Sequence, residues 1–109
     1  MNQLTRATIL AAGAQIAMVI AGHYVPAIQD FFAIGGMGIS ALAGWAALKG
    51  QPASLGAAAG SGALAGGVSA AVGIGVSVTL GDVPASLLAL GTASSAVTGL
   101  IGGLIGRRR

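Results

Sequence analysis

Charged side chains are scarce in this sequence: they make up 6% of its 109 residues, whereas 55% of the residues are hydrophobic. A soluble domain carries about 25% charged residues. A chain with so few cannot cover a water-facing surface without exposing large apolar patches. Disorder is excluded as well, because disordered chains are poor in the Leu, Ile and Val that abound here. The composition therefore predicts a protein that lies in the lipid bilayer.

Cysteine is absent altogether, which excludes disulfides, thiolate metal sites and cysteine nucleophiles. The sequence has two acidic residues and one histidine, from which neither a Ser-His-Asp site nor a paired-carboxylate site can be assembled. We therefore expect no enzyme, no metal and no cofactor. The formal net charge is +3, but the basic residues form no face interleaved with aromatics, so we expect no nucleic-acid partner.

Long uncharged stretches separate the few charges. A transmembrane helix needs about 20 mainly apolar residues, and four stretches approach or exceed that length. We predict an all-α integral membrane bundle, a single domain over residues 1–109, whose four transmembrane helices lie at about 7–25, 31–48, 55–80 and 84–106. The alternative for the first stretch is a cleaved signal peptide, with Arg6 before the apolar core and Val19-Ile20-Ala21 as the cleavage site.

The positions of the charges predict the topology. With four spans, the N-terminus, the loop after the second span and the C-terminus lie on one side of the membrane. That side then holds all the basic residues, whereas Asp30 and Asp82 lie on the other. Because basic residues favour the cytoplasmic side, we predict a multi-pass protein of the cell (inner) membrane with both termini in the cytoplasm. The topology signals are Arg6, Lys49, Arg107, Arg108 and Arg109.

The second and fourth spans resemble each other. Residues 25–50 align without a gap with residues 83–108, and both segments begin with Val-Pro-Ala. Gly44 falls opposite Gly102, and a basic residue ends each segment. The match indicates a duplication of residues 1–50 as 59–108, which predicts two tandem helical hairpins in parallel orientation. Convergence of Gly/Ala-rich spans on the same letters is the alternative.

Small residues recur at four-residue spacing in every span. In lipid, helices associate through close backbone approach, and faces with small residues four apart permit that approach. The third span carries glycine or serine on several faces, so we expect it at the centre of the bundle. We predict helix–helix contacts at Gly56, Gly60, Gly62, Gly66, Gly99 and Gly103.

Hydroxyl residues are concentrated in the third and fourth spans. They either line a narrow polar path or pack in the core, and the sequence leaves both interpretations open. The residues are Ser61, Ser69, Ser77, Thr79, Ser94, Ser95 and Thr98. Gln15, the one amide inside a span, is expected to make an interhelical hydrogen bond. We expect His23 and Trp45 in the two interfacial zones.

Three classes of function fit these features. Ion-coupled transport needs an ionisable group at membrane depth, and every charge falls at a predicted boundary of a span. We therefore favour a homo-oligomeric channel or carrier for a small solute, lined by the hydroxyl groups. The alternatives are a non-catalytic accessory subunit of a larger membrane complex and a holin-like pore former. The expected partners are the lipid bilayer and either further copies of the chain or a larger membrane complex.

Overall fold

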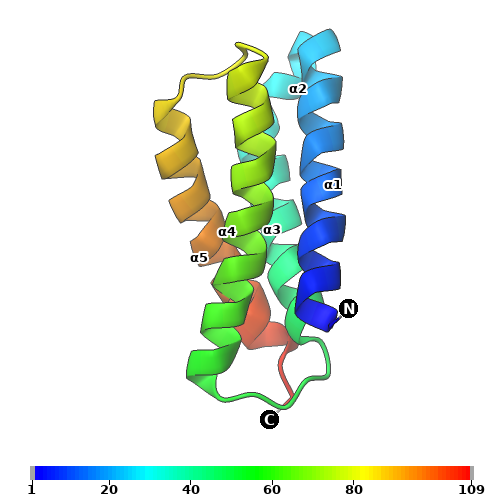
Figure 1. Cartoon of the computed structure of the whole chain (residues 1–109), viewed down its shortest axis with the longest axis vertical. Coiled ribbons are helices and arrows are strands. Elements are labelled where there is room, and N and C mark those ends of the chain that lie inside the picture. The colour runs from blue at the N-terminus through cyan, green and yellow to red at the C-terminus, as the bar shows by residue number, and fades with distance from the viewer. Residues whose placement is uncertain (1, 109) are drawn as a thin grey trace.

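Five helices make up the part of the chain that the computed structural model describes, residues 2–108. They are α1 (Gln3–Tyr24), α2 (Pro26–Gln29), α3 (Phe32–Leu48), α4 (Leu55–Thr79) and α5 (Ser86–Gly106). The four long helices run side by side and alternate in direction along the 42 Å axis of a molecule 23 Å by 21 Å across (Figure 1). Arg109, one of the predicted topology signals, lies outside the described residues.

The short helix α2 is the element that the sequence pattern does not predict. Val25 precedes a proline, which disfavours helical geometry there, and its φ of −123° and ψ of 93° end α1. Pro26 then occupies the first position of α2, where its fixed φ suits a helix and its missing N–H costs no hydrogen bond. The chain therefore makes one extra helical turn before α3 begins at Phe32.

Polar side chains cap the starts of two long helices. The Asn2 side chain accepts a hydrogen bond from the Thr5 N–H at 2.7 Å at the start of α1. The Ser54 hydroxyl accepts one from the Ala57 N–H at 3.1 Å at the start of α4. Each contact satisfies one of the N–H groups that a helix start leaves without an intrahelical partner. The two helices therefore begin where their capping residues stand.

Gly81 ends α4 through its backbone conformation. Its φ of +78° lies in the left-handed region, which glycine adopts without the steric cost that other residues bear. The Gly81 N–H donates to the Val78 carbonyl, and the Asp82 N–H donates to the Ser77 carbonyl, both at 3.0 Å. This pair of bonds is the Schellman motif, which satisfies the last carbonyls of a helix.

The helix richest in small residues lies at the centre of the bundle. α4 packs against α1, α3 and α5, which agrees with the expectation for the third apolar stretch. α1 and α5 lie on opposite sides of α4 (Figure 1). α3 likewise packs against α1, α4 and α5, so α3 and α4 share the centre of the bundle.

Small residues occupy the interior and large apolar residues the exterior. Ser40, Ala58 and Ser69 are fully buried, whereas Leu10 and Ile34 are 67% and 75% exposed. A water-soluble core has the reverse distribution, with large aliphatic side chains inside. Within the described residues, α1, α4 and α5 are long and apolar enough to cross a membrane, and α3 is a shorter apolar helix of 17 residues.

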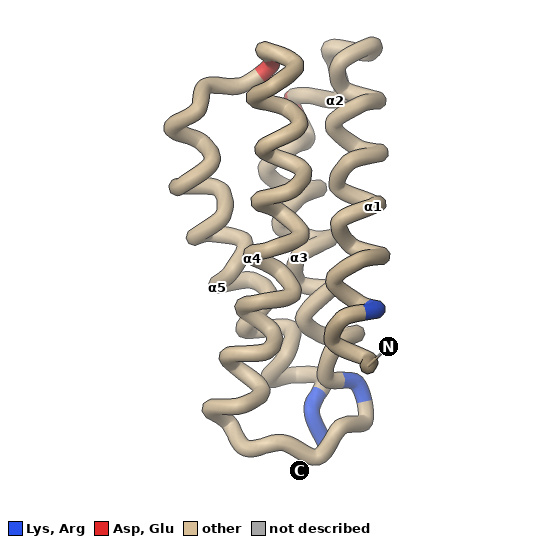
Figure 2. Tube along the Cα trace, viewed as in Figure 1, with Lys and Arg blue, Asp and Glu red and all other residues tan. Residues whose placement is uncertain are grey.

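The charges of the described residues separate by sign between the two ends of the bundle (Figure 2). Asp30 caps the C-terminal end of α2, and Asp82 lies in the loop between α4 and α5. We call this the acidic end. The opposite end, which we call the basic end, holds Arg6, Lys49, Arg107 and Arg108.

Candidate functional site

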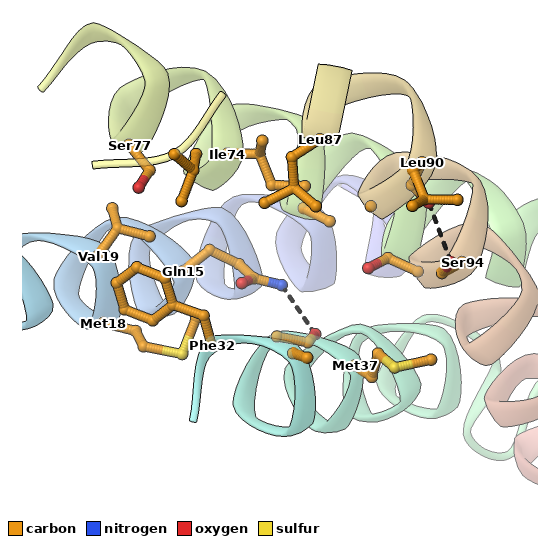
Figure 3. Close-up of a pocket in the computed structure, with 16 residues that line it drawn as sticks. Gln15, Met18, Val19, Phe32, Met37, Ile74, Ser77, Leu87, Leu90 and Ser94 are labelled. Atoms are coloured by element: carbon orange, nitrogen blue, oxygen red, sulfur yellow. Dashed lines mark hydrogen bonds between the residues drawn. The ribbon is translucent and has the colours of Figure 1, made fainter. Parts of the chain in front are cut away.

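A cavity of about 250 Å³ lies between the four long helices, in the half of the bundle nearer the acidic end (Figure 3). α1 and α4 line it with residues of their second halves, and α3 and α5 with residues of their first halves. Ala33 and Met37 of α3 and Leu90 of α5 line it and are also exposed on the outer surface. This space, which we call the bundle cavity, therefore opens sideways between α3 and α5.

The cavity ends where α3 and α5 come into backbone contact. A Cβ atom added to Gly44 would overlap the carbonyl oxygen of Gly99, and one added to Gly102 would overlap that of Ala41. These contacts lie in the basic half of both helices, where missing side chains allow the backbones to touch. Nearer the acidic end, large side chains such as Phe32 line the cavity between the helices instead.

The contact between α3 and α5 is reciprocal. In the alignment of residues 25–50 with 83–108, Gly44 corresponds to Gly102 and Ala41 to Gly99. Gly44 meets Gly99 and Ala41 meets Gly102, so equivalent positions exchange roles across the contact. Two copies of one element related by a two-fold axis make contacts of this kind. The pattern fits the duplication, which stays a prediction.

Four of the predicted contact glycines lie together between α4 and α5. A Cβ added to Gly66 would stand 2.8 Å from the Cα atom of Gly99, and one added to Gly103 would stand 3.0 Å from the Cα atom of Gly62. Real Cβ atoms essentially never come within 3.0 Å of another atom, and a distance of 3.0 Å is tighter than nine in ten of their contacts. The two helices therefore hold this separation because glycine occupies all four positions.

The other two predicted contact glycines face outward. Gly56 and Gly60 are exposed, and a Cβ added to either would meet nothing within 4 Å in the described part of the chain. Gly44 and Gly102, which follow the same four-residue spacing of small residues, do touch a neighbouring backbone. The spacing of glycines identifies a face on one helix, but it does not say how that helix is rotated against its neighbours.

A buried chain of hydrogen bonds crosses three helices beside the cavity. The amide nitrogen of Gln15, which is 3% exposed, donates to the Gly36 carbonyl at 3.1 Å and to Ser40 Oγ at 3.2 Å. Ser40 Oγ in turn donates to the Gly66 carbonyl at 3.2 Å. Gln15 thus makes the interhelical bond that its position predicts. Such bonds in membrane bundles stabilise by about 0.6 kcal/mol on average.

The seven hydroxyl residues of the predicted polar path do not gather in one place. Three of them line the bundle cavity: Ser77, Ser94 and Ser95. The other four lie outside its lining: Ser61, Ser69, Thr79 and Thr98. Most of these hydroxyls donate to a carbonyl of their own helix, as in the bond from Ser94 to Leu90 at 2.9 Å. The set is therefore divided between the cavity and ordinary positions on the helices.

Ser77 differs from the residues that bond within their own helix because its hydroxyl is both buried and unpaired. It is 1% exposed, and its Oγ atom has no hydrogen-bond partner among residues 2–108. Figure 3 shows this hydroxyl directed away from α4, toward Val19 of α1. A buried polar group without a partner costs about 1–3 kcal/mol. Thr92 Oγ1 is also unpaired, but it lies outside the cavity lining.

The basic end is tied together by contacts between segments far apart in the sequence. The Gln3 side chain donates to the Lys49 carbonyl at 2.9 Å, and the Arg108 N–H donates to the Gln51 carbonyl at 2.8 Å. The Lys49 ammonium group lies 4.9 Å from the centre of the Trp45 ring, within cation–π range. These contacts join both ends of the described chain to the loop between α3 and α4.

One hydrogen-bonded pair of side chains joins two segments at the acidic end. His23 Nδ1 at the end of α1 lies 2.9 Å from Asp82 Oδ2 in the loop between α4 and α5. The two side chains are 35% and 14% exposed, so solvent weakens this pair. No group of three or more His, Asp or Glu side chains in residues 2–108 is arranged to hold a metal ion.

The fold and the cavity define a class: an all-helical protein with apolar helices, three of them long enough to cross a membrane. No family model, no curated protein and no solved structure matches this chain. The bundle cavity and the distribution of charge are thus the features from which a function can be argued.

Proposed function

We propose that this chain is a four-span integral membrane protein that binds a small uncharged solute and carries it across the membrane. The charges determine the orientation that we propose for the protein in the membrane. The basic end faces the cytoplasm, and both termini lie on that side. The 42 Å long axis is close to the thickness of a bilayer with its headgroups, about 40–45 Å. The large apolar side chains on the outer surface then contact lipid tails.

The bundle cavity is the observation that carries the proposal. Ligand sites in helical bundles lie between the helices and are mainly apolar with a few polar groups. The cavity has this composition, because apolar side chains such as Met18, Ile74 and Leu87 line it together with a few polar residues, Ser77 among them. It is also placed off centre, toward one end of the bundle. A carrier that exposes its site to one side at a time fits this placement.

A carrier suits the distribution of hydroxyls better than a continuous polar pore does. Ser69 lies outside the cavity lining, and its hydroxyl is occupied by a bond of 3.0 Å to the Gly66 carbonyl. The basic half of the bundle contains the backbone contacts between α3, α4 and α5. Passage through the bundle therefore requires these helices to move relative to one another. A protein that must change conformation to pass its solute is a carrier and not an open pore.

Solute entry into liposomes tests the proposal. Purified protein is reconstituted in liposomes, and the entry of 1,2-hexanediol and of glycerol is followed by stopped-flow light scattering. We expect faster entry of 1,2-hexanediol than into protein-free liposomes, and no change for glycerol, because the cavity lining is mainly apolar. Ala33→Trp is the matched control, since Ala33 lines the cavity at its exposed mouth and a bulky ring there obstructs the entrance.

Three results contradict carriage. Equal entry of 1,2-hexanediol in wild-type, Ala33→Trp and protein-free liposomes shows that the protein does not accelerate transfer. Release of entrapped carboxyfluorescein indicates a large lesion and favours the holin-like alternative. Tight liposomes that contain a stable folded protein favour the accessory subunit.

A further inference from the structure

We propose that the ligand of the bundle cavity is an uncharged, mainly apolar molecule of about ten heavy atoms, with a hydroxyl or carbonyl group that hydrogen-bonds to Ser77. This inference rests on the proposed function, because it names the ligand class of the same site. Two independent observations support it: the size and lining of the cavity, and the unpaired hydroxyl in its wall.

The volume of the cavity sets the size of the ligand. An apolar cavity of about 150 Å³ holds one benzene molecule. The bundle cavity has about 250 Å³ and therefore accommodates about ten heavy atoms on the same scale. A phospholipid acyl chain that entered from the side would offer no polar atom along its length to Ser77. We therefore assign the cavity to a small amphiphilic molecule and not to a lipid tail.

The lining of the cavity excludes a charged ligand. Figure 3 draws its 16 lining residues, and none of them carries a charge. Transfer of an unpaired ion into such surroundings is strongly unfavourable. The amide nitrogen of Gln15 is already bonded to Gly36 and Ser40. Ser94 already donates to the Leu90 carbonyl.

We assign the polar group of the ligand to Ser77, because its hydroxyl is the buried, unpaired polar atom among the described residues of the lining. Its Oγ atom is buried and unpaired within residues 2–108, whereas the Thr79 hydroxyl two residues later donates to the Gly75 carbonyl at 2.9 Å. A hydroxyl both donates and accepts, so either a hydroxyl or a carbonyl of the ligand pairs with it. This bond removes the free-energy cost of burying the Ser77 hydroxyl without a hydrogen-bond partner.

The mouth of the cavity indicates the route of entry. Met37 and Leu90 line the cavity and are 38% and 67% exposed, and they stand on α3 and α5, between which the cavity opens. In the proposed orientation this opening faces the lipid tails. A mainly apolar molecule that has partitioned into the bilayer reaches the cavity from the side, without crossing the headgroup region again.

Binding of three naphthalene derivatives to the protein in phosphatidylcholine nanodiscs tests the inference. The probes are 1-naphthol, naphthalene and 1-naphthoate, which share one ring system and differ in the hydroxyl and the charge. Affinities are measured with empty nanodiscs as the partition background. The variants are Ser77→Ala, which removes the hydroxyl at nearly unchanged volume, and Ser61→Ala, a matched control on α4 outside the cavity lining.

We expect 1-naphthol to bind wild type and Ser61→Ala equally, and Ser77→Ala about three- to tenfold more weakly, the loss of one hydrogen bond between neutral groups. Naphthalene binds Ser77→Ala at least as well as wild type, and 1-naphthoate binds neither. Thermal unfolding of both variants checks that they are folded. Equal binding of 1-naphthol to wild type and Ser77→Ala overturns the inference, and so does binding no stronger than to empty nanodiscs.

The two proposals fail in different ways. Binding of 1-naphthol that depends on Ser77, without faster entry of 1,2-hexanediol into liposomes, retains the ligand site and overturns carriage. In the converse case, 1,2-hexanediol enters liposomes faster and Ala33→Trp blocks this entry, but 1-naphthol binds wild type and Ser77→Ala equally. That result retains carriage and overturns the ligand assignment.

Discussion

At the scale of single residues, this bundle depends on the places where a side chain is missing. Gly62, Gly66 and Gly99 bring the α4 and α5 backbones together, and Gly44 brings α3 to the same point on α5. Helices in lipid gain little from burying apolar surface against each other, so close packing supplies much of their attraction. Each of these positions contributes by permitting contact, not by making a bond.

Replacement of Gly62 by alanine is expected to destabilise the protein by about 1–3 kcal/mol. The new Cβ would overlap the Gly99 carbonyl oxygen and stand 3.0 Å from the Cα atom of Gly103, so α4 and α5 must separate. Gly60→Ala is the control, because Gly60 lies on the same helix and meets nothing within 4 Å in residues 2–108. Unfolding in micelles with increasing dodecyl sulfate, followed by circular dichroism, measures both. Equal midpoints for the two variants would contradict the contact.

At the scale of helices and turns, the sequence predicts where the elements lie along the chain better than how they pack against one another. The uncharged stretches and the prolines indicate where helices lie, and the left-handed glycine at position 81 follows from the turn sequence Gly81-Asp82-Val83-Pro84. The extra turn α2 is not predictable from the Val-Pro-Ala sequence that begins at Val25. The same sequence begins at Val83, directly before α5, and forms no separate helix there.

Replacement of Gly81 by alanine is expected to lower the free energy of unfolding by about 1–2 kcal/mol, the cost of a left-handed conformation for a residue with a Cβ. The Schellman bonds that end α4 need this conformation. Gly75→Ala on the same helix is the control, since it is helical and its added Cβ meets no described atom within 4 Å. Thermal unfolding in detergent compares the two variants. A loss of stability in Gly75→Ala equal to that in Gly81→Ala would show that the turn conformation is not the cause.

At the scale of the whole molecule, the candidate site lies where the helices separate from one another, in the half of the bundle nearer the acidic end. The residues around the bundle cavity come from all four long helices, and no pattern within one helix marks them. Ser77 is one of seven hydroxyl residues that the sequence picks out, and only its environment distinguishes it. Val19 and Phe32, which line the same cavity, belong to other helices. The polar character of the site is therefore predictable from the sequence, but its location is not.

The absence of native cysteine permits a direct test of the membrane topology. Single cysteines are introduced as Gln51→Cys at the basic end and Ala85→Cys near the acidic end; both positions are exposed. In intact cells, a membrane-impermeant maleimide is expected to label Ala85→Cys and to spare Gln51→Cys until the membrane is permeabilised. Labelling of both variants in detergent is the control. Labelling of Gln51→Cys from outside would contradict the four-span orientation.

The backbone contacts between α3, α4 and α5 also constrain how the sequence can evolve. At some glycines the obstacle to a Cβ is a side chain, as for Gly35 against Met18 and Gly91 against Ile74. There a second substitution that shortens the neighbour restores the space, so such pairs can drift together. At Gly44 and Gly99 the obstacle is main chain, which every amino acid shares. Compensation there requires the helices themselves to move apart, so we expect those positions to stay glycine while the paired positions change.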